Sequence, residues 1–173
     1  NVNNLIKISE NKNLLIVQIV QYKNSSTLIE NIKIDNLTLQ NIPLNVSANK
    51  DTRILWAGPK NWLLVTNKKN LLKEIEEKFN ELNFAVTDLS QSKAIIELEG
   101  DLVKEILKKG CPFNINELGK NNCVNSVFNG MSVNIDMLDS EINKVRIFTL
   151  RSFGESLYHS ITDSCLEFGY EAI

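Results

Sequence analysis

The residue that looks most like a reactive centre is Cys111, in the stretch KKGCPFNI (108–115). A reactive cysteine needs its thiolate favoured, usually by a helix N-terminus or by neighbouring cations. Cys111 instead follows a predicted helix end, because two lysines suit the last turn, Gly110 suits the position after it and Pro112 blocks continuation. The helix dipole opposes a thiolate there, although the lysines partly offset it. We expect Cys111 to pack in the core as a small hydrophobic residue, with a reactive thiol as the alternative.

The single histidine, His159, offers a second possible chemistry. Ser156, Ser160 and Asp163 all lie within four residues of it, so a Ser-His-Asp arrangement can be written for this segment. Polar neighbours of this kind on one helix usually form a solvated face. We expect His159 to face solvent, and we place no catalytic residue in this chain.

Cofactor and metal motifs do not emerge from the sequence. The seven glycines form neither a G-x-G-x-x-G fingerprint nor a phosphate-binding loop. Cys111, Cys123 and Cys165 lie far apart along the chain, and one histidine cannot complete a usual zinc ligand set. We expect no cofactor-binding or metal-binding residue here, and an odd number of cysteines favours reduced thiols.

The two tryptophans lie in one short segment, RILWAGPKNWLLV (53–65). Pro59 suits the second position of a turn, so the segment predicts a hairpin with Trp56 and Trp62 close to that turn. Tryptophan beside a turn either closes the end of the core or anchors a protein interface. Both interpretations stay open, and Trp56, Trp62 and Phe113 are the residues that we predict for an interface.

The elements that position these residues follow from periodicity. Alternating or β-branched runs predict strands, and residues 32–39 read as one half-buried strand. Asn129-Gly130 predicts a two-residue hairpin turn. Apolar residues at helical spacing predict an amphipathic helix in the segment 67–84; its stripe is Leu71, Leu72, Ile75, Phe79 and Leu82.

Two more helices are expected in the second half of the chain. One covers 101–109. The other begins at a capping box formed by Ser152 and Glu155 and ends before Gly169. The order of strands and helices predicts an α+β fold of two similar, ferredoxin-like halves, with mostly antiparallel sheet covered by helices. We treat 1–173 as a single domain with possible subdomains 1–92 and 93–173.

Composition narrows the classes of partner. The chain has 173 residues, 43% of them hydrophobic, and a net charge of -2 with acidic and basic residues interspersed, which argues against nucleic acid. The apolar runs are too short to cross a bilayer and no basic-then-apolar leader precedes them, so we expect no membrane association and a cytoplasmic location.

Three segments together resemble the gamma subunit of heterotetrameric sarcosine oxidase. They are the tryptophan segment, the segment DLSQSKAIIELEGDLVKEILKKGCPFNI (88–115) and the segment RSFGESLYHSI (151–161). The middle segment also resembles the wider folate-dependent aminomethyltransferase fold, although Gly100-Asp101 stands where that group often has Gly-Pro. An iron-sulfur maintenance family carries a Lys-Gly-Cys motif whose later residues are not reproduced after Cys111.

The resemblance implies a supporting subunit. In such complexes FAD, FMN, NAD, zinc and the tetrahydrofolate site belong to other subunits, so no cofactor is expected in this chain. Its partners would be the alpha, beta and delta subunits, and it would pack on alpha. The complex would demethylate sarcosine oxidatively and pass the one-carbon unit to tetrahydrofolate. The alternatives are a free-standing folate-binding protein of the aminomethyltransferase or iron-sulfur maintenance type, and a small adaptor without a flavoenzyme partner.

Overall fold

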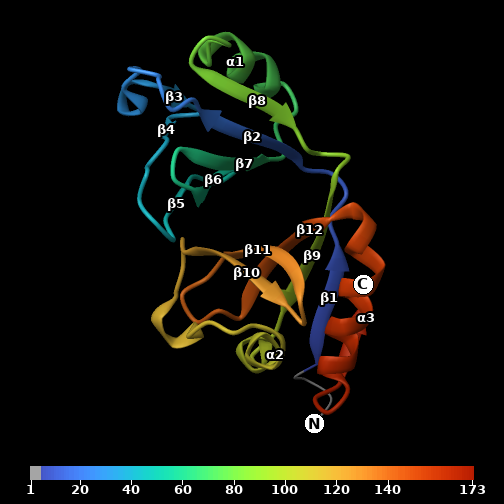
Figure 1. Cartoon of the computed structure of the whole chain (residues 1–173). Helices are drawn as coiled ribbons and strands as arrows, with labels where there is room; N and C mark the ends of the chain where they lie inside the picture. Colours follow the sequence, from blue (N-terminus) through green and yellow to red (C-terminus); the bar gives the residue numbers. More distant parts are fainter. Residues whose placement is uncertain (1–4) are drawn as a thin grey trace. The chain divides into compact units, whose positions relative to one another are not determined.

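The strand β1 (Ile6–Glu10) joins a sheet that is otherwise built from the C-terminal half of the chain. The computed structural model describes residues 5–173, which form two units: residues 5–12 with 92–173, here called unit 1, and residues 13–91, called unit 2 (Figure 1). These units differ from the expected subdomains in the placing of β1, because its hydrogen-bonding partners lie far along the sequence.

Unit 1 contains a six-stranded sheet with the order β10-β11-β12-β9-β1-β13. All neighbours are antiparallel except the pair β1 and β13. The other five strands are β9 (Lys93–Glu99), β10 (Cys123–Phe128), β11 (Met131–Met137), β12 (Lys144–Leu150) and β13 (Tyr170–Ala172).

Two helices, α2 (Val103–Gly110) and α3 (Gly154–Cys165), pack on one face of this sheet. Short 3-10 turns, Ile115–Glu117 and Arg151–Phe153, follow α2 and precede α3. Apolar residues of both helices and of five of the strands form a shared core, which includes Ile8, Leu98, Ile106, Ile147 and Leu157. Because alternate strand residues point to one face, the helices bury one set while the other set faces away.

Unit 2 is a five-stranded antiparallel sheet with the order β5-β6-β7-β2-β8. Its strands are β2 (Leu15–Gln21), β5 (Val46–Ala48), β6 (Thr52–Gly58), β7 (Asn61–Thr66) and β8 (Phe84–Asp88). The helix α1 (Leu71–Lys78) packs on one face through Leu71 and Ile75. The expected α+β fold with mostly antiparallel sheet is therefore confirmed.

The expected single strand over 32–39 is wrong. The structure has a 3-10 turn at Ile29–Asn31, followed by a two-residue strand β3 (Lys33–Ile34) paired with β4 (Leu37–Thr38). Asp35 and Asn36 form the turn with φ values of 49° and 63°. Aspartate and asparagine tolerate this left-handed region better than most residues, so the alternating pattern folds back as a small hairpin.

The helix α1 is shorter than its apolar pattern indicated. It ends at Lys78, because Phe79 is extended and Asn80 forms a turn that returns the chain to β8. The rings of Phe79 and Phe84 close this loop with a centroid distance of 4.9 Å. Leu82, expected on the buried stripe, lies in the loop and is 83% exposed.

The expected capping box before α3 is also wrong. Ser152 lies inside the 3-10 turn Arg151–Phe153, and no side chain caps the first residues of α3. The turn runs directly into the helix, and the Gly154 amide donates to the carbonyl of Arg151. The expected hairpin at Asn129-Gly130 is confirmed, with φ values of 46° and 84° between β10 and β11.

Candidate interaction site

Gly110 is the last residue of α2 rather than the residue beyond it. The expectation that Gly110 would occupy the position after the last turn is therefore wrong, since Cys111 is the first extended residue, with φ -114°. The reason for a glycine is steric, because a Cβ atom at this position would lie 2.6 Å from the Phe128 ring. Gly110 lets the end of α2 sit directly on β10.

Cys111 packs with the core of unit 1 and is only 9% exposed. Burial raises the pKa of its thiol to about 12, so the thiol stays protonated at neutral pH. Burial also raises the pKa of Cys165 to about 11, although Lys109 opposes that shift. These environments favour the packing interpretation of Cys111, since a thiol that keeps its proton is a poor nucleophile.

His159 does not join a catalytic arrangement with its serine and aspartate neighbours. Its Nε2 atom lies 3.8 Å from a carboxylate oxygen of Glu155, one helical turn earlier. The Ser160 hydroxyl instead accepts a hydrogen bond of 2.6 Å from Asn129. The exposed histidine therefore lies on a polar helix surface, as the sequence indicated.

Trp56 and Trp62 are directly opposite each other in the β6–β7 hairpin, but they differ in burial. Trp62 is 1% exposed, and its indole donates to the carbonyl of Gln40 at 2.9 Å. Its prediction as an interface residue is corrected, because this side chain is part of the core of unit 2. The half-buried Trp56 donates to the Asn41 side chain at 3.3 Å, and its interface role stays a prediction.

Phe113 lies in the loop after α2 and is half-buried against the core of unit 1. It therefore belongs to a different unit from Trp56, and each is a separate candidate contact. The interface role of Phe113 stays a prediction.

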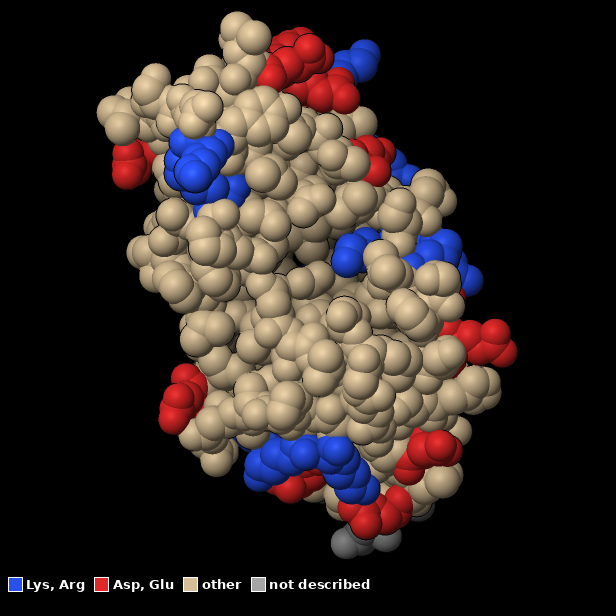
Figure 2. All heavy atoms as spheres, viewed as in Figure 1, with Lys and Arg blue, Asp and Glu red and all other residues tan. Residues whose placement is uncertain are grey.

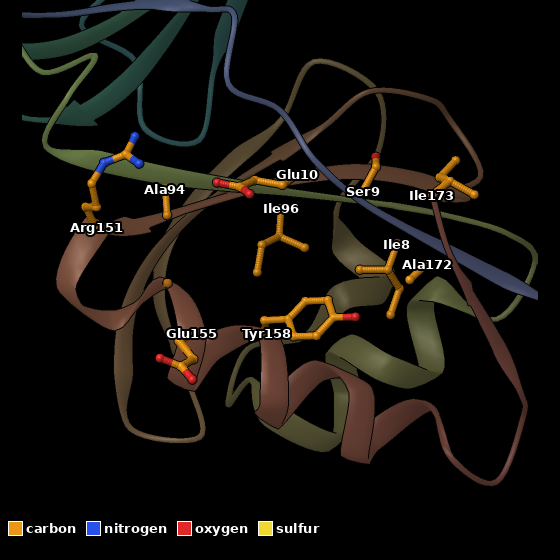
Figure 3. A pocket seen from close by; sticks show the side chains of 11 residues that line it. Ile8, Ser9, Glu10, Ala94, Ile96, Arg151, Glu155, Tyr158, Ala172 and Ile173 are labelled. Carbon is orange, nitrogen blue, oxygen red and sulfur yellow. The ribbon is translucent and has the colours of Figure 1, made fainter.

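A groove in unit 1 was not indicated by any sequence motif. It has a volume of about 560 Å³ and lies between β1, β9, β13 and the start of α3; we call it the β1–α3 groove. Ile8, Ala94 and Ile96 supply its apolar floor. Figure 3 shows the Tyr158 ring lying alongside Ile8 and Ile96, with its hydroxyl directed toward β13.

Gly154 opens α3 and explains why this wall of the groove lies so close to the sheet. A Cβ atom at Gly154 would lie 3.0 Å from the Cβ atom of Ala94 on β9, which is tighter than ordinary packing. Gly154, in the segment RSFGE, is therefore the one residue that could have indicated the groove in the sequence. The need for a glycine there comes from Ala94, which lies 60 positions earlier in the chain.

The margins of the groove carry charges of both signs (Figure 3). The Arg151 guanidinium donates to the Lys93 carbonyl at 2.9 Å, and Glu10 pairs with Lys12 at 2.9 Å. Glu155 is the third charged residue at the margin. An apolar floor with a mixed polar margin suits a side chain or a small ligand that is mainly apolar.

Hydrogen bonds hold the pKa of Asp35, in unit 2, well below the ordinary value of a carboxyl group. The Thr52 hydroxyl donates to it at 2.6 Å and the Lys68 ammonium at 2.9 Å, and together they lower the pKa of Asp35 to about 2. Asn49 adds a hydrogen bond of 3.1 Å. Because these partners come from three separate loops and strands, the cluster has a structural role in tying the β3–β4 hairpin to the sheet.

Three further properties of the described residues concern metal binding, membrane spans and the distribution of surface charge. Within residues 5–173, no group of three or more His, Cys, Asp or Glu side chains is arranged to hold a metal ion. Over the same residues, no helix is long and apolar enough to span a membrane. Figure 2 shows acidic and basic residues in small separate groups on the face in view, without a continuous basic patch on that face.

Comparison with known proteins decides the family. The sequence model of the sarcosine oxidase, gamma subunit family matches residues 33–167. The chain belongs to this family. The match contains Trp56, Phe113 and the α3 side of the groove, while β1 lies before it.

A curated member of the gamma subunit family is similar in sequence to this chain. It is the sarcosine oxidase subunit gamma of Corynebacterium sp. (strain U-96), 28% identical over 120 residues, which cover 68% of this chain. The matched region spans 58% of the length of that relative.

Two solved structures share the fold. A chain of the heterotetrameric sarcosine oxidase from Corynebacterium sp. U-96 superposes with a TM-score of 0.83 and 21% identity, covering 97% of this chain and 87% of that chain. The glycine cleavage system aminomethyltransferase T from Bartonella henselae gives a TM-score of 0.69 and 13% identity, covering 98% of this chain and 48% of that one. This chain therefore shares its fold with about half of that aminomethyltransferase.

Proposed function

We propose that this chain is a non-catalytic subunit of a sarcosine oxidase-type heterotetramer. The observation that carries the proposal is the match of the gamma subunit family to residues 33–167. Agreement in fold over 97% of the chain with a chain from the heterotetrameric enzyme supports it. The chain would pack on the alpha subunit of a complex that also contains beta and delta subunits, and we place that complex in the cytoplasm.

In this proposal the reaction takes place on the partner chains. Oxidative demethylation of sarcosine, with transfer of the one-carbon unit to tetrahydrofolate, would use FAD, FMN, NAD, zinc and folate sites on the other subunits. This chain would contribute shape and surface. The buried, protonated state of Cys111 and the polar surroundings of His159 support a structural role.

Three surfaces are candidates for the contact with alpha. Trp56 is a half-buried aromatic on β6, and Phe113 is one in the loop after α2. The β1–α3 groove could receive an apolar side chain of a partner between Ile8 and Tyr158. Aromatic residues and pockets of this kind contribute a large share of binding energy in protein interfaces.

Co-purification from the native cells tests the proposal. The chain carries an affinity tag at its own locus, and the bound proteins are identified by mass spectrometry and by flavin absorbance. We expect large flavin-bearing subunits to elute with the chain in a fixed ratio, and sarcosine oxidation to follow the same fractions. A chain that elutes alone from these cells would contradict the proposal.

Titration with tetrahydrofolate separates the proposal from a free-standing folate-binding protein. The purified chain is titrated by calorimetry, and sarcosine turnover is measured in the same preparation. We expect neither one-to-one folate binding nor turnover without partner subunits. Tight stoichiometric binding by the chain alone would favour the free-standing protein instead.

A further inference from the structure

A second pocket, which we call the Lys93 pocket, lies on unit 1 at the end of the sheet where β9 begins. It has a volume of about 390 Å³ and is lined by residues of β9, β10, β11 and β12. The residues that matter here are Lys93, Ser132, Asn134, Asn125 and Leu150. None of these residues entered the argument for the proposed function.

Strand register places these side chains on one face. Lys93 is directly opposite Leu150, while Phe148, two residues before Leu150, is opposite Asn134. Asn134 is in turn opposite Asn125 on β10. Because directly opposed residues share a face and residues two apart along a strand do too, the lysine and the two asparagines project from the same side of the sheet. Figure 1 shows these strands side by side.

The Lys93 ammonium has no internal partner. Among residues 5–173, no hydrogen bond or ion pair is formed by its side chain, although the residue is half-buried. Burial lowers the pKa of this ammonium below its ordinary value, which is the sign of a cation that has lost water without gaining an anion. The Arg151 guanidinium donates to the Lys93 carbonyl at 2.9 Å and adds a second positive charge nearby.

Neutral hydrogen-bond donors accompany the ammonium in the pocket. The Ser132 hydroxyl forms no hydrogen bond with a described residue. The Asn134 amide donates to Asn125 at 2.5 Å through one hydrogen, and an amide nitrogen carries two. A cation, a hydroxyl and an amide N–H are the groups that bind a carboxylate.

We propose that the Lys93 pocket binds a carboxylate, which pairs with the Lys93 ammonium and accepts hydrogen bonds from Ser132 and Asn134. A singly charged carboxylate matches the single charge of the Lys93 ammonium, whose side chain has no partner among the described residues. The carboxylate belongs either to a small free acid or to an Asp or Glu side chain of a partner subunit. The carboxylate site does not rest on the proposed function. Only the second source, an acidic side chain of a partner subunit, rests on it.

Acetate is the probe for the full chain in solution. The ε-carbon signals of ¹³C-labelled lysines are followed against pH in sodium acetate and in sodium chloride of equal ionic strength. We expect acetate to raise the pKa of Lys93 by about 1 unit, because an opposite charge within contact favours the ammonium. Backbone amide signals of Ser132 and Asn134 should move in parallel and saturate.

Two variants make the acetate result specific. Lys93→Met keeps the length of the side chain and removes its charge, so the acetate-dependent shifts of Ser132 and Asn134 should be lost. Lys144→Met is the matched control, because Lys144 stands at the other end of the same strand pair and already pairs with Glu99 at 2.6 Å. Shifts that persist in Lys93→Met, or a Lys93 pKa that responds equally to chloride, would overturn the proposal, and so would tighter binding of inorganic phosphate.

Acylation of the assembled complex identifies the source of the carboxylate. Lys93 is labelled with an amine-reactive ester and quantified by peptide mass spectrometry, with and without acetate. Protection by assembly alone indicates an acidic side chain of a partner, and protection only with acetate indicates a free acid. Labelling that neither assembly nor acetate slows would contradict the site. Because the acetate titration uses the chain without partners, its result stands whether or not a complex forms.

Discussion

A glycine at a helix end can be required for either of two reasons, and the sequence around Gly110 does not distinguish between them. Its place between two lysines and Cys-Pro is typical of a residue that ends a helix with a positive φ. In the structure it is helical, and the close approach of the Phe128 ring is what requires the missing side chain. A contact between α2 and β10, not the local backbone, therefore selects glycine here.

Replacement of Gly110 by alanine should destabilise the protein. A Cβ atom 2.6 Å from the Phe128 ring forces the ring or the helix to move, and overpacking of this kind costs about 1–3 kcal/mol. Urea denaturation followed by circular dichroism measures the change. Gly119→Ala is the control, since a Cβ atom there has only the Ser140 carbonyl nearby, at 3.8 Å. Equal stability of the two variants would refute the steric explanation.

Asp35 should make the free energy of unfolding depend on pH in the acidic range. Its pKa of about 2 in the folded chain lies below the ordinary value of 3.8, so the carboxylate stabilises the fold above about pH 4. That contribution is lost as the pH falls from about 4 toward 2. Asp35→Asn should lower stability by about 1 kcal/mol at pH 7, a modest figure because Lys68 is partly solvated, and should flatten the unfolding profile in this window.

The measurement for Asp35 is the free energy of unfolding at a series of pH values. Glu76→Gln, at an exposed position on α1, serves as the matched change of charge. If Asp35→Asn and the parent chain lose stability in parallel between pH 4 and 2, another group is responsible.

At the scale of elements, the β6–β7 hairpin contains a cross-strand pair of tryptophans that differ in burial. Trp62 points into the core of unit 2 and fixes its indole on the Gln40 carbonyl. Trp56 is opposite it and half-buried, next to the irregularity in the strand between Trp56 and Gly58. The same residue type in the same hairpin therefore serves the core on one strand and remains accessible on the other.

Alanine at the two tryptophans should separate these roles. Trp62→Ala removes a fully buried ring and should cost about 3–5 kcal/mol, whereas Trp56→Ala should cost about 1 kcal/mol. Urea denaturation of both variants gives the comparison. A larger loss for Trp56→Ala would show that Trp56 is the main packing residue of the hairpin.

At the scale of the whole molecule, the chain combines two α+β units that each have their own core. β1 is joined to unit 1 by pairing with β9 and β13, so the chain crosses from unit 1 to unit 2 and back. The surfaces that could contact a partner are distributed over both units. Binding to a partner subunit is therefore the property of the whole chain that should be measured.

Co-purification should respond to Trp56 if it is an interface anchor. Trp56→Ala should lower the amount of flavin-bearing partner recovered by about tenfold, because aromatic anchors contribute more than 1 kcal/mol each to binding. Leu82→Ala is the control, since Leu82 is equally apolar and even more exposed in the loop after α1. Recovery that falls equally in both variants, or in neither, would remove Trp56 from the interface.

The sequence by itself determined the features that depend on a few neighbouring residues. The hairpin turn at Asn129-Gly130 follows from two residues that accept positive φ, and the strands and the α+β class follow from apolar alternation. The segments around the tryptophans and Cys111 indicated the gamma subunit family, to which the chain belongs.

Only the tertiary structure decided the features that depend on residues far apart in the chain. The burial of Trp62, the close contact of Gly110 with Phe128, the pairing of β1 and the two pockets all depend on residues 18 or more positions apart in the chain. Local propensity fixes the backbone over a turn or two, whereas burial and strand partners are set by which distant surfaces the folded chain brings together.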